Sequence, residues 1–171
     1  MSNTSKETIE NRSQLIQYFV NGIKKKNNLR IGVEHEKFLF NKNDLKRIDY
    51  KHLKQVFEIL KDKGWEPEYE KDKVIGLKRD KQKITTEPGF QYELSGAPFK
   101  NIHSVCSENN FHFNELKNVF SSASITTSSI AYDPFNKLVE IPKSPKERYK
   151  IMTSEMPKGG KLSLDMMYKT A

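Results

Sequence analysis

Residues 31–40 read IGVEHEKFLF, and we expect this stretch to form the central strand around which the rest of the chain is organised. Its β-branched and aromatic side chains are typical of a buried strand. Side chains at positions i and i+2 of a strand point to the same face. Glu34 and Glu36 therefore share one face of the predicted strand, and Lys37 lies on the other.

The two carboxylates of this strand are the first candidate functional groups. They would stand roughly 7 Å apart along the chain, and they repel each other if both are ionised and desolvated. A cation beside them relieves that repulsion, and carboxylate oxygens are the ligands that Mg²⁺ prefers. The ordinary alternative is an edge strand with two solvated glutamates. The strand alone leaves both interpretations open.

The composition indicates a folded domain with a heavily charged surface. The chain has 171 residues, of which 35% are hydrophobic and 30% are charged. Its apolar residues cluster in periodic runs, which argues against disorder. We expect residues 1–171 to form a single domain that begins with a polar tail over residues 1–12.

The net charge of +8 raises the question of an anionic partner. Most of the positive charge comes from lysine, which is the weaker choice for bidentate contacts with phosphates or bases. No stripe of stacking aromatic residues runs between the lysines, as single-strand binders require. A solvated surface without a nucleic-acid partner is therefore the favoured interpretation. A basic module that binds nucleic acid or another anion remains the competing hypothesis.

Cysteine content and hydropathy bear on the compartment. Cys106 is the only cysteine of the chain, so no intrachain disulfide can form and a reducing compartment is expected. The sequence shows no signal peptide and no apolar run of membrane-spanning length. We therefore expect a cytoplasmic protein without a membrane partner.

The periodicity of apolar residues predicts an α+β fold. Helical spacing predicts helices over residues 6–26, 50–63 and 101–121 and a short one from Pro145. Strands are predicted over residues 65–70, 74–77, 83–86 and about 91–95, with a β-rich run over 124–132. Strands so close in sequence favour antiparallel hairpins. Residues 162–171 are predicted to begin a buried strand, which would make this chain the front part of a longer protein.

A second candidate segment surrounds the predicted turn at Pro88-Gly89. Gln91, Glu93 and Ser95 follow it at alternating positions and should emerge on one face of a strand. Glu87 lies on the far side of the turn, from where its carboxylate could converge on the same point.

Several short motifs carry a resemblance to a known family. In chain order they are GVEHEKF at 32–38, EPGFQYELSGAP at 87–98, RYKIM at 148–152, MPK at 156–158 and LDMM at 164–167. In this order they resemble the plant-type glutamate–cysteine ligases of plants and many bacteria, from about residue 13 to the last residue. The resemblance implies a glutamine-synthetase-like fold, which is a curved, mostly antiparallel sheet with helices packed on one face. In this chain that sheet would be incomplete.

The resemblance also implies a reaction. Members of the family join the γ-carboxylate of glutamate to the amine of cysteine with ATP and Mg²⁺, through an acyl phosphate, as the first step of glutathione synthesis. By resemblance, the metal ligands would be Glu34, Glu36, Glu87 and Glu93. The substrate-binding residues would be Arg148 and Gln91, and Lys37 would contact the nucleotide. No residue is assigned a catalytic role beyond these contacts.

Some features depart from the family pattern. Phe90 stands where a smaller residue is expected, and the lone Cys106 cannot form the redox disulfide of the plant enzymes within this chain. Family members are also much longer, so we expect this chain to be inactive alone. A related carboxylate–amine ligase that uses a different amine is a further alternative.

Overall fold

The computed structural model of the protein describes residues 8–128 and 130–171. Two units are distinguished, one ending at Arg30 and one spanning Ile31–Ala171. The two units are described separately below.

The first unit contains helix α1, Arg12–Asn21, and a short 3-10 helix, η1, Lys26–Asn28. A capping box fixes the start of α1, because Asn11 and Gln14 each accept a hydrogen bond from the other's backbone N–H. The predicted helix over residues 6–26 was too long at both ends, although residues 6 and 7 lie outside the described part. No residue of α1 is buried, so its predicted apolar stripe does not contribute to a core.

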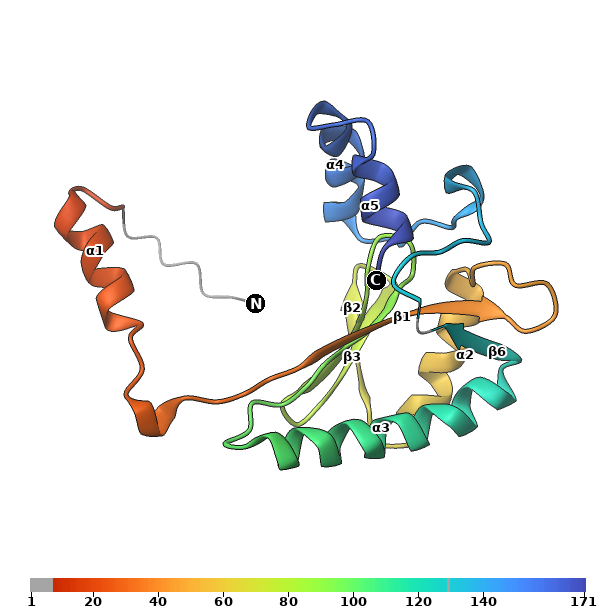
Figure 1. Cartoon of the computed structure of the whole chain (residues 1–171), viewed down its shortest axis with the longest axis horizontal. Helices are drawn as coiled ribbons and strands as arrows, with labels where there is room; N and C mark the ends of the chain where they lie inside the picture. Colours follow the sequence, from red (N-terminus) through yellow and green to blue (C-terminus); the bar gives the residue numbers. More distant parts are fainter. Residues whose placement is uncertain (1–7, 129) are drawn as a thin grey trace. The chain divides into compact units, whose positions relative to one another are not determined.

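The second unit is built on a six-stranded sheet with the order β2-β3-β4-β5-β1-β6 (Figure 1). Its strands are β1 Glu34–Asn41, β2 Glu66–Glu70, β3 Lys73–Arg79, β4 Gln82–Thr86, β5 Tyr92–Ser95 and β6 Ile125–Ser128. Every neighbouring pair is antiparallel, which confirms the predicted hairpins. β1 lies between β5 and β6, but its two halves pair differently: Glu34–Lys37 pair with β5, and Phe38–Asn41 pair with β6. Among the described residues, the two glutamates therefore have a strand partner on one side only.

One face of the sheet packs against α2, Tyr50–Lys61, and α3, Ile102–Ser122. Both helices begin at residues whose side chains accept a backbone hydrogen bond, Asp49 and Asn101. The core consists of strand residues such as Leu39, Leu77, Ile84, Tyr92 and Leu94 with Leu53, Val56, Leu60 and Leu116 of the helices. These two helices confirm the prediction, and they leave the opposite sheet face free for polar side chains.

The remaining helices are α4, Glu147–Glu155, and α5, Ser163–Lys169, with short 3-10 helices at η2, Leu138–Glu140, and η3, Met156–Lys158. Figure 1 shows α4 and α5 together at the top of the view and α3 at the bottom. The strand predicted from residue 162 was wrong. Leu164, Met167 and Tyr168 have the i, i+3, i+4 spacing of one helix face, and Met167 and Tyr168 are buried on it.

The class is therefore α+β, as predicted. Among the described residues, no helix combines the length and the apolar character needed to cross a bilayer.

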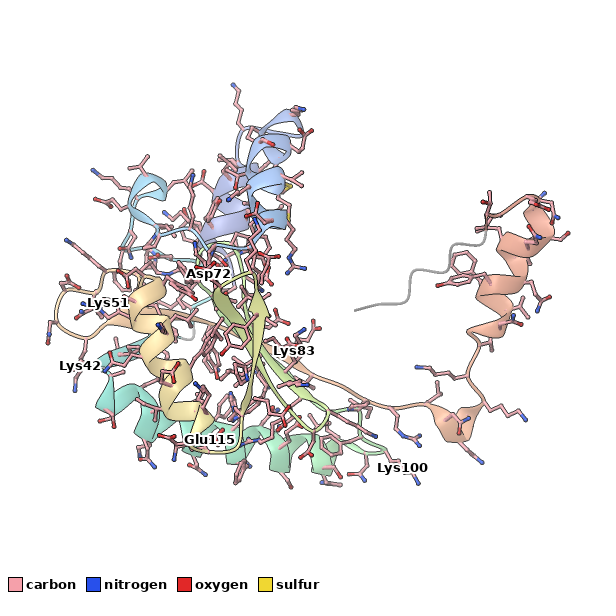
Figure 2. The ribbon with its side chains drawn as sticks, turned by 180° about the vertical axis from the view of Figure 1, so that it is seen from behind. Lys42, Lys51, Asp72, Lys83, Lys100 and Glu115 are labelled. Carbon is pink, nitrogen blue, oxygen red and sulfur yellow. The ribbon has the colours of Figure 1, made fainter. Side chains whose placement is uncertain are left out.

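A buried ion pair fastens α3 to the sheet. Glu115 of α3, labelled in Figure 2, accepts hydrogen bonds from Arg79 at 2.8 Å and from the Trp65 indole at 3.1 Å. Burial alone would raise the pKa of Glu115, but the hydrogen-bonding groups of His112, Arg79 and Trp65 outweigh it and lower that pKa to about 2. The ionised carboxylate therefore stabilises the fold.

We expect Glu115→Gln to lower the free energy of unfolding at neutral pH by about 2–4 kcal/mol, because it leaves a buried guanidinium unpaired. A depressed carboxyl pKa contributes stability above its ordinary value of 4.5, and that stability is lost as the pH falls toward 2. The difference between the two chains in urea unfolding should therefore shrink over that interval. Glu58→Gln, which breaks an exposed pair with Lys61, should leave the stability nearly unchanged. Equal losses in both variants would contradict this account.

Candidate functional site

The register of the central strands brings acidic side chains together on the polar face of the sheet. Glu36 of β1 lies directly opposite Glu93 of β5, and Glu34 lies opposite Ser95. Directly opposed residues of an antiparallel pair point to the same face, with Cβ atoms roughly 5 Å apart. The predicted shared face of Glu34 and Glu36 is confirmed.

The turn between β4 and β5 adds a further carboxylate. Glu87 closes this turn through two backbone hydrogen bonds, from Glu87 N to Gln91 O and from Phe90 N to Glu87 O. Phe90 has a φ of 58°, in the region that favours glycine. Its ring is buried in the core, so packing offsets a strained backbone at the position where a smaller residue was expected. The turn directs Glu87 toward Glu93.

The four acidic residues predicted from the sequence line one cavity of about 650 Å³. They are Glu34, Glu36, Glu87 and Glu93, and His35 and Ala171 complete the lining. Acidic side chains from β1, from the β4–β5 turn and from β5 thus meet at one place, which we call the acid cluster. Their role as metal ligands stays a prediction.

The electrostatics of the acid cluster are unfavourable without a counter-charge. Burial, and then the charges of Glu87 and Glu93, raise the pKa of Glu36 to about 7, although Arg47 opposes them. The pKa of Glu87 is also raised, first by burial and then by the charge of Glu93. A hydrogen bond from Tyr149 opposes this rise without cancelling it. The cluster therefore resists carrying its full negative charge, as expected for carboxylates that share a site.

Hydrogen bonds orient the acids. Glu93 accepts from the hydroxyls of Thr85 at 3.2 Å and Ser95 at 2.9 Å, and Glu87 accepts from the Tyr149 hydroxyl at 3.1 Å. Within the described residues, no three His, Cys, Asp or Glu side chains are already spaced as a metal site. The donor set is nevertheless all carboxylate, which suits a hard divalent cation such as Mg²⁺.

Two cationic side chains stand beside the acid cluster. Arg148 lies 3.8 Å from Glu87, measured from Nη2 to Oε1, and its side chain is 64% exposed. Lys146 is buried and donates to Thr86 O at 2.8 Å. Burial, and then the charge of Arg148, lower the pKa of Lys146 to about 8, while Glu87 and Glu93 oppose that shift.

Sequence reasoning identified Arg148 but missed Lys146 and Tyr149. A signal for Lys146 was present, because it immediately precedes α4. A lysine at a helix N-terminus is unfavourable for the helix dipole, so another interaction must hold it there. Tyr149 lies in the motif RYKIM, which drew attention to Arg148 beside it, but its contact with Glu87 joins segments far apart in the sequence.

The other two residues predicted to contact a ligand, Gln91 and Lys37, make contacts within the fold. Gln91 accepts from Gly89 N at 2.8 Å and donates to Met167 O and Thr170 O at 3.2 and 2.9 Å. Both amide hydrogens thus hold α5 against the β4–β5 turn, and a substrate contact stays a prediction. Lys37 lies on the opposite sheet face, with its ammonium 4.3 Å from the centre of the Phe113 ring. The structure does not bring Lys37 to the acid cluster.

Arg47 is a buried residue that the sequence did not point to. Its guanidinium donates to Gly89 O, to Asp133 at 3.3 Å and to Tyr168 O at 3.4 Å. It also stacks over Phe38 of β1, with Cζ 4.4 Å from the ring centre. One side chain thus ties β1, the β4–β5 turn and α5 together behind the acid cluster.

A smaller cavity of about 290 Å³ adjoins the acid cluster, with Glu36 and Glu87 in its wall. Its other lining residues include every methionine of the chain after Met1: Met152, Met156, Met166 and Met167. Methionine thioethers are adaptable and polarizable. An apolar wall therefore borders the carboxylates.

Comparison with known proteins gives consistent matches. The model of glutamate-cysteine ligase family 2 (GCS2) matches residues 30–171. This chain is 43% identical to chloroplastic glutamate–cysteine ligase A of Oryza sativa subsp. japonica and to the chloroplastic glutamate–cysteine ligase of Arabidopsis thaliana. Each of these matches extends over 160 residues, which is 93% of this chain. The corresponding protein of Solanum lycopersicum is 41% identical over the same length. The chain spans about a third of the length of these relatives, 32%, 31% and 31% respectively.

We expect Glu36→Gln to raise the free energy of unfolding above pH 7 by about 1–3 kcal/mol in metal-free buffer, allowing for solvent screening of a half-buried group. A raised carboxyl pKa does not lower the free energy of unfolding below pH 4.5, where the group is protonated in both the folded and the unfolded chain. The loss of stability grows as the pH rises from 4.5 to about 7. The two chains should therefore have similar stability near pH 4.5. Thermal melting across this range, with exposed Glu66→Gln as the control, measures the effect. A destabilised Glu36→Gln above pH 7 would show that the repulsion is absent.

Proposed function

The chain belongs to glutamate-cysteine ligase family 2, and from this premise we propose that it supplies the cation-binding wall of an ATP-dependent carbon–nitrogen ligase. The proposed reaction joins the γ-carboxylate of glutamate to the amine of cysteine, the first step of glutathione synthesis. The partners are glutamate, cysteine and ATP, and the cofactor is Mg²⁺. We also propose that the antiparallel sheet belongs to the glutamine-synthetase-like architecture.

The observation that carries this proposal is the convergence of Glu34, Glu36, Glu87 and Glu93 on one cavity. Activation of a carboxylate by ATP gives an acyl phosphate, so carboxylate and phosphate oxygens must first approach one another. When bound, Mg²⁺ neutralises such crowded anions and aligns them. Three of the acids stand on strands of the sheet and Glu87 on the β4–β5 turn, and neighbouring hydroxyls orient Glu87 and Glu93.

The cations beside the acid cluster suit anionic substrates. Arg148 is mostly exposed and offers a planar guanidinium, which grips a carboxylate through two parallel hydrogen bonds. Lys146 is buried next to Glu87 and Glu93, where its charge offsets part of theirs. We assign Arg148 to the glutamate substrate and Lys146 to the balance of charge within the cluster.

The alternative of a ligase for a different amine shares the same acid cluster. The methionine-lined cavity borders Glu36 and Glu87 and offers an apolar surface to a small side chain. That surface suits the thiol of cysteine, and it suits another small apolar amine equally. Competition between cysteine and other amines in a turnover assay of the complete reaction distinguishes the two.

We expect the chain to bind Mn²⁺, used as a probe for Mg²⁺, and Glu93→Gln to weaken that binding by about ten-fold or more, because it removes a charged oxygen donor. Isothermal titration calorimetry at pH 8 measures the affinity. Glu66→Gln is the matched control, since Glu66 is an exposed glutamate of the same sheet that pairs with Lys78 at 3.3 Å. It should leave the affinity unchanged.

Absence of Mn²⁺ binding to the unsubstituted chain would contradict the proposed function, and so would equal losses in Glu93→Gln and Glu66→Gln. Salt-sensitive binding of DNA or RNA that is indifferent to Glu93→Gln would instead favour the basic-module hypothesis.

We expect this 171-residue chain alone to show no ligase turnover, because the relatives it matches are about three times as long. An assay that couples ADP release to NADH oxidation, with glutamate, cysteine, ATP and Mg²⁺, tests this. Turnover that depends on both amino acids and disappears in Glu93→Gln would contradict the expectation of inactivity while supporting the proposed reaction.

A further inference from the structure

The hydroxyl of Tyr149 stands at the junction between the acid cluster and Arg148. It accepts a hydrogen bond from Arg148 Nη2 at 2.6 Å, and it lies 3.1 Å from Glu87 Oε1 and 3.0 Å from Thr86 O. The side chain is 3% exposed. A buried hydroxyl thus links a candidate metal ligand to a candidate substrate ligand.

The distribution of protons decides which acceptor the hydroxyl serves. A phenol has a single proton to donate, and both Thr86 O and Glu87 compete for it. Thr86 O already accepts from the ammonium of Lys146 at 2.8 Å. The charged oxygen of Glu87 is also the stronger acceptor. The Tyr149 proton is therefore assigned to Glu87.

Tyr149 is buried, while the Arg148 side chain is mostly exposed. Lys146 Nζ lies 5.3 Å and Arg148 Cζ 4.7 Å from the centre of the ring. Among the described residues, the only side-chain hydrogen bond donated by Arg148 goes to Tyr149. Since a guanidinium has five N–H donors, the others remain free for a ligand. The hydroxyl is therefore the hydrogen-bonding contact that orients a mostly exposed guanidinium, whose pair with Glu87 is longer, at 3.8 Å.

We propose that Tyr149 is a positioning residue that couples cation binding at Glu87 to substrate-carboxylate binding at Arg148. The chain of contacts runs from the Glu87 carboxylate through the Tyr149 hydroxyl to the guanidinium. A cation that fixes Glu87 also fixes the hydroxyl and the guanidinium, so the substrate meets an oriented donor.

The proposal rests on the proposed function, and it requires the effects of the two ligands on each other's affinity to be equal. If a divalent cation tightens glutamate binding, glutamate must tighten cation binding by the same factor. Removing the hydroxyl should lower that factor without removing any group that touches either ligand. A residue that only supports the fold would change melting temperature and leave the factor as it was.

The experiment is a double titration of the 171-residue chain with Mn²⁺ and L-glutamate at pH 8. In the unsubstituted chain, each ligand should tighten the other by about five-fold or more. In Tyr149→Phe, Mn²⁺ measured alone should bind within about three-fold of the unsubstituted chain, and the mutual enhancement should fall to about one. Tyr168→Phe removes a different buried hydroxyl, which contacts Thr153 at 2.6 Å, and should keep the enhancement.

The outcomes separate this proposal from the function on which it rests. Binding of neither ligand to the unsubstituted chain overturns the proposed function and this inference together. Mutual enhancement that survives in Tyr149→Phe overturns the coupling alone. If Tyr149→Phe fails to fold, the unsubstituted chain supplies the test: Mg²⁺ should shift the NMR signals of the Tyr149 ring and of the Arg148 guanidinium together, and an Arg148 signal that Mg²⁺ leaves unchanged overturns the proposal.

Discussion

The mutual repulsion of Glu36, Glu87 and Glu93 is the constraint around which the second unit is arranged. Burial, and then the charges of neighbouring carboxylates, raise the pKa of Glu36 and of Glu87. Ionised groups so placed disfavour the folded chain. The structure nevertheless holds them together on three different segments. A cation is the simplest group that converts this cost into binding free energy.

The framework holds the acids close by fixing their backbones. Direct opposition within the β1–β5 pair sets Glu36 against Glu93. Glu87 depends on the β4–β5 turn, which Arg47 holds through Gly89 O and Gln91 ties to α5. A buried guanidinium that satisfies two backbone carbonyls and a carboxylate from separate segments is costly to displace. The acids therefore cannot move apart without breaking contacts in β1, in the turn and in α5.

Periodicity and turn chemistry predicted most of the strands and the shared face of Glu34 and Glu36, while the full set of four acids came with the family resemblance. Alternation along β1 put Glu34 and Glu36 on one face, and Pro88-Gly89 marked the turn that brings in Glu87. Residues 162–171 misled because a short apolar run suits a strand and a helix equally. Local patterns do not encode contacts between distant segments. The order of the six strands depends on such contacts, and so do the positions of Lys146 and Tyr149 beside the acid cluster.

The central claim is that the acid cluster attracts a divalent cation, and paramagnetic line broadening by Mn²⁺ tests it most directly. With substoichiometric Mn²⁺, backbone amide signals of residues 34–36 and 87–93 should broaden first. Signals of α3, on the other face of the sheet, should stay sharp, and excess Mg²⁺ should restore the broadened ones. Broadening that spares residues 34–36 and 87–93, or that Mg²⁺ does not reverse, would contradict the account.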